Sequence, residues 1–596
     1  MVSGREEAST HTTGTLARWQ TACIVALALV VRVVYLFQVR SHPLFSTLTG
    51  DPALYRDQAL AILAGTPAPP HAYFHSSPLY PWFLAAVGTL STDLDAARVA
   101  QIGVGIATVI LITVLARRAF SSMAALVAGV LAALYVPFIF FEAEFLEITL
   151  VLAFLAGALI LLLGAAERLS EERGVGRAAW AGFLLGLASL GKPNLLLFAP
   201  VGGVWLATRG FGRFGSGPTD RRAAWFRAGA LFFMVTGLTI LPATLHNLRV
   251  EGDLIPVSSN GGINLWIGNN EGANGMFSVP PEMRLDLRAA STEAAERDVG
   301  RDLSAGEVSD YWAGRAAGFM RNNPGSWLRL TAWKFVLFWN HYEIPNHYHL
   351  GFVKGFAPIL RVPVGTFAVV APLGLLGLAL AWRRRATPLF VAFCATFLVS
   401  VLPFFITGRY RLGATVALLP AAGAAIAELL RVARARETRR LVVSLVVLSA
   451  LAVAVNVDLV EFTIAPMYNT VGAILGGRGD MEGAASAFAR AVEEDPRDLS
   501  SRYNLGRALM ELRRPEEAET HFRMATTMHP GYHEAWIGLG RARAVQDDLA
   551  EAVESWERVL AADPPAPEAL ASEARALIRA AEALEEEQGE PEDHDH

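Results

Sequence analysis

The stretch of sequence that decides the fold runs from Leu16 to Val39 and reads LARWQTACIVALALVVRVVYLFQV. An α-helix rises about 1.5 Å per residue, so about 20 apolar residues cross the hydrocarbon core of a bilayer. This stretch is too long for the apolar region of a signal peptide, and it lacks a small-x-small cleavage site. We therefore expect it to stay in place as a first membrane-spanning helix.

Similar apolar runs recur along the chain as far as residue 457. They fall at 97–116, 123–141, 145–164, 178–192, 194–208, 226–245, 362–382, 386–406, 412–430 and 440–457. The sequence therefore predicts an all-α, polytopic helix bundle of about 11 membrane spans. The pair between residues 178 and 208 is the least regular, because the segment Gly191–Asn194 separates two short helices.

The composition agrees with a membrane protein. The 596 residues are 53% hydrophobic and 18% charged, whereas soluble domains are about 25% charged, which argues against an ordinary cytosolic enzyme. The only two cysteines, Cys23 and Cys394, lie in apolar runs, which excludes a disulfide framework and a cysteine-based zinc cluster. The basic residues are almost all arginine, which is typical of a GC-rich bacterium.

Arginines in the short loops predict the orientation, because such loops are richest in basic residues on the cytoplasmic side. They all follow even-numbered spans: Arg117, Arg118, Arg168, Arg173, Arg177, Arg209, Arg213, Arg221, Arg222, Arg227, Arg383, Arg384, Arg385, Arg431, Arg434, Arg436, Arg439 and Arg440. We therefore expect the N-terminal tail, 1–16, in the cytoplasm of a bacterium and a multi-pass chain in its inner membrane. The periplasmic face then carries the outer loops 41–96 and 247–361, the turns 142–147 and 407–411, and the C-terminal tail.

The C-terminal tail has an internal repeat of 34 residues. Four columns keep this period: Gly472, Gly506 and Gly540; Ala484, Ala518 and Ala552; Phe488, Phe522 and Trp556; Pro496, Pro530 and Pro564. Small residues let two helices approach, the aromatic ring fills the gap, and proline ends the second helix. The pattern resembles the tetratricopeptide repeat. It predicts an α-solenoid over 466–587, with three repeats and a capping helix, and an acidic disordered tail over 588–596.

The two parts of the chain differ in charge. From Pro466 onward the sequence has 27 acidic and 13 basic residues, which leaves the first 465 residues with a net charge of +9. Tetratricopeptide repeats bind peptides or protein partners and do not themselves catalyse reactions. The array is therefore expected to hold a protein partner, with packing against the membrane part as the alternative.

Polar residues of the membrane part lie mostly at the outer ends of the spans, whereas transporters place them near mid-membrane. The first outer loop begins Gly50-Asp51-Pro52-Ala53-Leu54-Tyr55, and its helical spacing predicts an amphipathic helix on the membrane surface with Asp51 near its N-cap. The function is therefore expected on the outer face.

Six motifs follow one another along residues 17–430. They are Asp51-(x)3-Tyr55 with Pro78-Leu79-Tyr80-Pro81; Leu134-Tyr135-Val136-Pro137 with Glu142, Glu144 and Glu147; Gly186-(x)4-Gly191-Lys192-Pro193-Asn194; Pro242-(x)4-Asn247-(x)4-Gly252-Asp253 with Asn260 to Asn269; Asn323-Pro324-(x)2-Trp327 with Phe338-Trp339 and Glu343; and Arg409-Tyr410-Arg411-Leu412. Their order resembles the GT-C glycosyltransferases, in particular the protein O-mannosyltransferases and aminoarabinose transferases. The resemblance implies a polyprenyl-phosphate sugar as the donor.

The resemblance also implies roles for individual residues. Asp51, partly desolvated at the membrane surface, would be the catalytic base that deprotonates the acceptor hydroxyl. Arg409 and Arg411, with Lys192 as a further contact, would bind the donor phosphate; the alternative is that both arginines only anchor the chain at the interface. Many members have a second acid directly after the loop-one aspartate, where this chain has Pro52, so Asp51 stands alone there.

Further candidates surround this core. Glu144 and Glu147 form a candidate acceptor site or second acidic site, and Glu144 is the favoured residue for this role. At least two of the three acids Glu142, Glu144 and Glu147 are expected to be solvated. Arg32 within the first span is expected to pair with an acid inside the bundle. Tyr55, His75, Asn247 and Glu343 are outer-loop candidates. The sequence leaves open whether the protein binds a divalent metal. His71 and His75 have the i,i+4 spacing of a metal site, whereas His341, His347 and His349 belong to no motif. His594 and His596 fit a solvated tail better than a metal site.

These features predict an integral-membrane glycosyltransferase domain over 17–460 that moves a hexosyl or pentosyl group from a polyprenyl-phosphate carrier to an acceptor. The acceptor is expected to be a protein, with a glycolipid or polysaccharide as the alternative, and no nucleic-acid partner is expected. Three other functions stay open: a lipid-linked glycan polymerase or ligase, a non-catalytic membrane scaffold that presents the repeats, and a transporter.

Overall fold

The computed structural model describes residues 3–66, 74–168, 172–208, 219–278, 287–563 and 565–589. These residues form helices, and the only β-type pairing among them is an isolated bridge between Met276 and Ile406. The all-α fold class is therefore confirmed. The chain divides into two compact units: unit 1 comprises residues 1–40 and 48–460, and unit 2 comprises residues 41–47 and 461–596.

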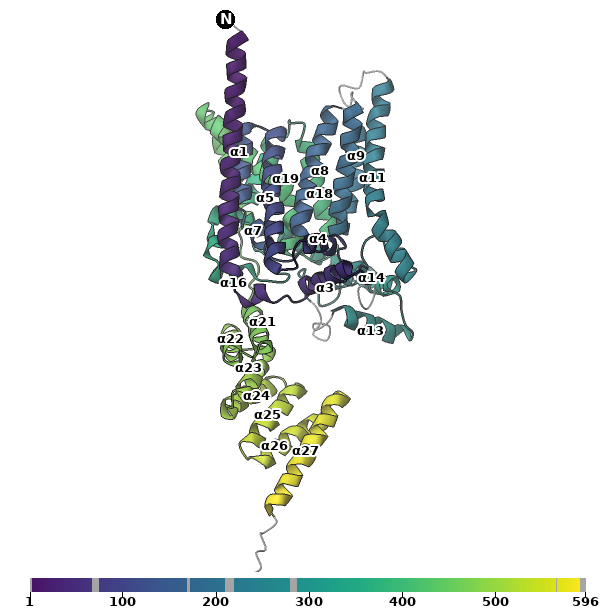
Figure 1. The fold of residues 1–596 in the computed structure, drawn as a ribbon, viewed down its shortest axis with the longest axis vertical. Coiled ribbons are helices and arrows are strands. Elements are labelled where there is room, and N and C mark those ends of the chain that lie inside the picture. The colour runs from purple at the N-terminus through teal and green to yellow at the C-terminus, as the bar shows by residue number, and fades with distance from the viewer. Residues whose placement is uncertain are drawn as a thin grey trace, which may run out of the picture. The chain divides into compact units, whose positions relative to one another are not determined.

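Unit 1 is a bundle of apolar helices that run side by side (Figure 1). They are α1 (Ser3–Val39), α5 (Leu94–Ala119), α6 (Ser122–Leu134), α7 (Val136–Phe141), α8 (Ile148–Glu167), α9 (Glu172–Gly191), η1 (Pro193–Leu197), α10 (Phe198–Thr208), α11 (Thr219–Glu251), α17 (Phe367–Leu380), α18 (Thr387–Val401), α19 (Gly408–Arg434) and α20 (Thr438–Val455). Six of them, α1, α5, α8, α11, α19 and α20, are long and apolar enough to cross a membrane alone. Each predicted span coincides with one helix or with a broken pair, such as η1 and α10.

Glycines allow neighbouring helices of the bundle to approach closely. A Cβ atom on Gly182 of α9 would lie 2.3 Å from the carbonyl oxygen of Phe232 on α11, and one on Gly377 of α17 would lie 1.8 Å from that of Ala421 on α19. No side chain fits in either space. Membrane helices gain much of their association energy from such close backbone packing, because lipid supplies no hydrophobic drive between them.

A buried ion pair links α1 to the segment that joins α7 to α8. Arg32 donates to the Glu142 carboxylate at 2.8 Å and to the carbonyl oxygen of Ala133 at 3.0 Å. Neither charged side chain is more than 3% exposed. The expectation that Arg32 pairs with an acid inside the bundle is confirmed.

Replacing Arg32 with methionine is expected to destabilise unit 1 by about 3–5 kcal/mol, because Glu142 would be left charged and buried without a partner. Unfolding of the purified protein in detergent measures the effect, and Arg18→Met on the exposed part of α1 serves as the control. The double variant Arg32→Met with Glu142→Met is expected to recover most of the loss. Equal stability of Arg32→Met and wild type would contradict the assignment.

Short helices lie across one end of the bundle. They are α3 (Asp51–Ala64), α4 (Leu79–Gly88), α12 (Gly261–Gly268), α13 (Leu287–Val299), α14 (Ala305–Asn322), α15 (Pro324–Trp339), α16 (Leu350–Phe356), η3 (Pro358–Arg361) and η4 (Pro363–Gly365). Figure 1 shows α3, α4, α13 and α14 gathered there. Apart from η4, these helices come from the two segments that the sequence assigns to one face, so residues distant in sequence meet at this end.

Unit 2 is a stack of helix pairs. The pairs are α21 (Ala465–Gly477) with α22 (Met481–Glu494), α23 (Leu499–Glu511) with α24 (Pro515–Met528), and α25 (His533–Val545) with α26 (Leu549–Leu560), followed by α27 (Glu568–Gly589). Small and aromatic residues of the 34-residue repeat meet as expected: a Cβ atom on Gly506 would lie 2.7 Å from the ring of Phe522. The helix α2 (Pro43–Ser46) also belongs to unit 2, where Arg478 donates to Ser46 at 2.9 Å.

Candidate functional site

Asp51 is the first residue of α3. The preceding Gly50 caps the helix with a φ of +60°, a conformation that favours glycine. The Asp51 side chain is 48% exposed, and its Oδ2 lies 3.6 Å from Nη1 of Arg409. The structure therefore brings together two predicted site residues that are 358 positions apart, and it leaves the carboxylate accessible from outside.

Arg409 and Arg411 lie in the first turn of α19, which begins earlier than the sequence suggested. Thr407 caps the helix, since its side-chain oxygen accepts the Tyr410 N–H at 3.2 Å. The Arg409 side chain is 6% exposed, and its Nε and Nη1 make no hydrogen bond to any described residue. Because its distance to Asp51 exceeds that of a hydrogen bond, Arg409 presents unused donors beside the carboxylate.

A second ion pair lies next to the first. Lys192 follows α9, and its Nζ lies 2.6 Å from Oε1 of Glu147, while the Tyr55 hydroxyl donates to Oε2 at 3.4 Å. Burial works to raise the pKa of Glu147, but Lys192 and Arg409 outweigh it and hold that pKa below its usual value. Both cations also contact one ring: Nζ of Lys192 lies 4.4 Å, and the Arg409 guanidinium 5.3 Å, from the centroid of Tyr410.

Glu144 lies in the same turn but has a different environment. Its backbone oxygen accepts a hydrogen bond from Gln101 at 2.6 Å, whereas neither carboxyl oxygen has a hydrogen-bond partner among the described residues. Burial raises the pKa of Glu144 well above its usual value, and nearby Arg409 only partly opposes this. The protein therefore favours the neutral form of Glu144 more than water does.

The expectation that at least two of the three glutamates are solvated is wrong. Glu142, Glu144 and Glu147 are 2%, 3% and 1% exposed. The turn after α7 is enclosed by other helices, since its three glutamates contact Arg32 of α1, Tyr55 of α3 and Gln101 of α5. Arg32 pairs with Glu142 and Lys192 pairs with Glu147, whereas burial raises the pKa of Glu144.

Arg411 has a different environment from Arg409. Its guanidinium is 1% exposed, donates to the carbonyl oxygens of Asn340 and Tyr342, and lies 2.9 Å from Glu343. It also lies 4.0 Å from the ring centroid of Phe367. Of the two arginines predicted to bind phosphate, the geometry favours Arg409, because the donors of Arg411 already hold the loop after α15.

Asn247 and His75 connect outer segments. The Asn247 side chain is fully buried, accepts the Phe74 N–H at 3.1 Å and donates to the carbonyl oxygens of Ile255 and Val257. The His75 ring contacts the Ser259 hydroxyl at 3.3 Å. These contacts join the loops that surround the site.

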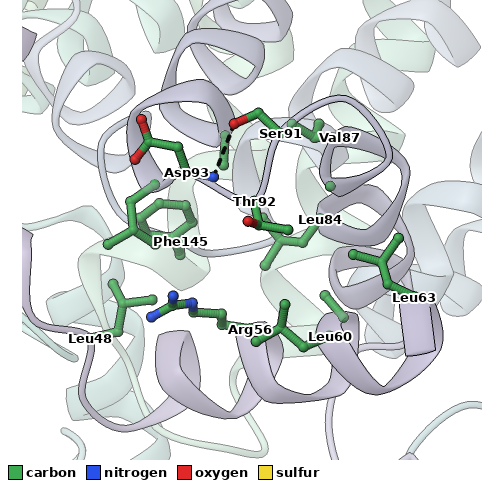
Figure 2. A pocket seen from close by; sticks show the side chains of 14 residues that line it. Leu48, Arg56, Leu60, Leu63, Leu84, Val87, Ser91, Thr92, Asp93 and Phe145 are labelled. Carbon is green, nitrogen blue, oxygen red and sulfur yellow. Dashed lines mark hydrogen bonds between the residues drawn. The ribbon is translucent and has the colours of Figure 1, made fainter. Parts of the chain in front are cut away.

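No group of three or more His, Cys, Asp or Glu side chains that would suit a metal ion occurs in the described part of the chain. His71, His594 and His596 lie outside the described residues. A small hollow lies near the site, between α3, α4 and the start of α5, with Leu60, Leu84 and Phe145 in its lining (Figure 2). Its volume of about 30 Å³ holds one or two water molecules, so it is too small for a sugar.

The comparisons with known proteins agree with the resemblance seen in the sequence. Residues 75–236 match the family model described as dolichyl-phosphate-mannose-protein mannosyltransferase, a span that includes Glu144, Glu147 and Lys192 but neither Asp51 nor Arg409. Residues 474–533 and 503–567 match a tetratricopeptide-repeat model. The glycosyltransferase-type membrane unit and the repeats in unit 2 are thus confirmed at the level of family resemblance. No curated protein matches the chain.

Several solved structures are similar over parts of the chain. The apo oligosaccharyltransferase of Archaeoglobus fulgidus is 14% identical with a TM-score of 0.41, and the match covers 75% of this chain and 57% of that one. ArnT from Cupriavidus metallidurans bound to undecaprenyl phosphate is 20% identical with a TM-score of 0.31, covering 68% and 78%. The first tetratricopeptide domain of human RPAP3 is 25% identical with a TM-score of 0.19, covering 21% and 96%.

Proposed function

We propose, from the match of residues 75–236 to a family of glycosyltransferases, that the chain is a membrane enzyme that moves a sugar from a polyprenyl-phosphate carrier to an acceptor. The observation that carries this proposal is the contact between a half-exposed Asp51 and a buried Arg409 with unused donors. A carboxylate that can accept a proton lies beside a cation that can bind an anion, which supports sugar transfer from a phosphate.

The proposed reaction inverts the configuration at the sugar. The acceptor hydroxyl attacks the anomeric carbon from the face opposite the phosphate, Asp51 takes the hydroxyl proton, and the bond between carbon and phosphate oxygen breaks. Polyprenyl phosphate leaves with the bonding electron pair. A carboxylate that is 48% exposed is reachable by an acceptor from outside the bundle.

Arg409 and Lys192 would bind the leaving phosphate. The two cations share the face of Tyr410, and their buried environment strengthens charge-assisted hydrogen bonds to phosphate oxygens. Arg409 has free donors, whereas Lys192 would keep Glu147 as its counter-ion. Glu144 and Tyr55 would line the same space, and the Glu144 carboxyl, which has no hydrogen-bond partner among the described residues, would bind the acceptor or the sugar.

We propose a protein as the first acceptor class and a glycolipid or polysaccharide as the second, in a bacterial inner membrane with the site on the periplasmic side. The tetratricopeptide repeats support a protein partner, because such arrays bind peptides in a concave groove. Arginines of the loops after even-numbered spans support the orientation. Protease treatment of spheroplasts tests it: digestion of the repeats is expected, and their protection would overturn the orientation.

Incubation of the purified protein with a panel of undecaprenyl-phosphate sugars and a serine-containing peptide tests the function. Transfer of one sugar from one donor is expected, with chemical identification of the product. Formation of a long glycan would instead identify a polymerase or ligase. If binding partners assemble normally on a chain that transfers nothing from any donor, the scaffold alternative holds.

A further inference from the structure

The segment 41–47 belongs to unit 2, whereas the residues before and after it belong to unit 1. Its helix, α2, contacts α21, the first helix of the repeats. Arg478, which follows α21, donates to the Ser46 hydroxyl at 2.9 Å and also to the Thr47 hydroxyl. The leucine and the phenylalanine of α2 are buried. The repeat unit therefore holds a segment that the sequence places in the first outer loop.

This segment lies close in the chain to the proposed catalytic base. Asp51 begins α3, and three residues join it to Thr47. Such a link spans about 14 Å at most when fully extended, so the position of Thr47 limits where α3 can begin. The Asp51 carboxylate lies 3.6 Å from Arg409, which exceeds the length of a hydrogen bond, so its position depends mainly on the backbone of α3.

The chain enters the repeats again after residue 460, and this connection also leads back to the site. The residues before it are held by the loop after α15, where the Asn340 side chain donates to the carbonyl oxygen of Val457 at 2.8 Å. Arg411, in the same turn of α19 as Arg409, donates to the carbonyl oxygen of Asn340. Two connections to unit 2 thus start from segments that carry or contact residues of the site.

We propose that the segment 41–47, held by α21, positions Asp51 for proton transfer, so that the repeat unit takes part in the reaction in addition to its proposed binding of a partner. The inference rests on the proposed function. Arg478 is then a positioning residue that acts on the base through α2 and the turn at Gly50. A partner protein that shifts α21 when it binds the repeats would also shift Asp51 and so regulate transfer.

The variant Arg478→Ala tests this role, because it removes the donors to α2 and leaves every residue of the site in place. The purified full-length protein is expected to transfer sugar with a kcat about tenfold lower, less than the roughly 100-fold effect of a displaced catalytic group, because the other contacts of α2 remain. The KM for the undecaprenyl-phosphate sugar is expected to change little. Arg478→Lys keeps a charged donor and is expected to recover most of the loss.

The same contact can be removed from its other side. Ser46→Ala together with Thr47→Val is expected to lower kcat as much as Arg478→Ala, and all three changes together are expected to lower it no further, because they break one contact. Hydrogen exchange supplies an independent measurement. The amides of Phe45, Ser46 and Thr47 donate to carbonyl oxygens of residues 42 and 43, and they are expected to exchange faster in Arg478→Ala.

Arg490→Ala is the matched control, because this arginine is exposed on α22 of the same unit. It is expected to leave both kcat and hydrogen exchange unchanged. Wild-type kcat in Arg478→Ala overturns the inference, and so does an equal loss in Arg490→Ala or an unchanged exchange rate in α2. A wild type that transfers no sugar overturns the proposed function and this inference together, whereas an active wild type leaves only the role of the repeats at stake.

Discussion

The variant Asp51→Asn is expected to lose about 1,000-fold in kcat for sugar transfer, within the range attributed to a general base. Asparagine has nearly the same shape, but its amide cannot accept the proton of an acceptor hydroxyl at neutral pH. The fold should not change, because the Asp51 side chain is half exposed and Gly50 caps α3 through its backbone. The KM for the lipid donor should change little, since Asp51 does not contact the leaving phosphate in the proposed reaction.

Asp57 supplies the control for this variant. It lies on the same helix, α3, and its side chain is exposed to solvent. Asp57→Asn makes the same chemical change and is expected to retain full activity. Transfer by Asp51→Asn at the wild-type rate would show that Asp51 is not the base.

Arg409→Ala is expected to reduce kcat by about 100- to 1,000-fold, the loss found when one preorganised donor to a developing charge is removed. Arg409 is also the ion-pair partner of Asp51, so its removal leaves that carboxylate without a cation next to the proposed phosphate site. Arg409→Lys keeps the charge but loses the planar fork, and its loss should be smaller. Steady-state kinetics with varied lipid donor separate the effect on kcat from that on KM.

Arg431 is the matched control because it lies at the other end of the same helix, exposed and paired with Glu428 at 2.9 Å. Arg431→Ala is expected to transfer sugar at the wild-type rate. If Arg409→Ala and Arg431→Ala are equally active, Arg409 does not bind the phosphate, and the interfacial-anchor interpretation of this arginine is favoured.

The helices of both units could be predicted from the sequence because their signals are local. A run of about 20 apolar residues or a repeated column of Gly, Ala and Phe determines a helix without knowledge of distant residues. The sequence predicted the kind of partner that Arg32 has, an acid inside the bundle, because an unpaired charge inside a membrane costs free energy. The individual partner, Glu142, required the structure.

The geometry of the site depends on contacts between distant segments. The sequence separates Asp51, Lys192 and Arg409 by hundreds of residues, and no local pattern shows that Arg409 has unused donors while Arg411 holds a loop. Burial of the glutamate turn was missed because acids at a span boundary are usually solvated.

We propose that one end of the bundle transfers a sugar from a polyprenyl phosphate with Asp51 as the base. The most direct measurement is the release of undecaprenyl phosphate from radiolabelled undecaprenyl-phosphate sugars by the purified chain in the presence of a serine-containing peptide. Wild type is expected to release one undecaprenyl phosphate for each sugar transferred, and Asp51→Asn is expected to release almost none. Equal release by both proteins would exclude Asp51 as the base, and no release by wild type with any sugar of the panel would exclude the proposed transfer.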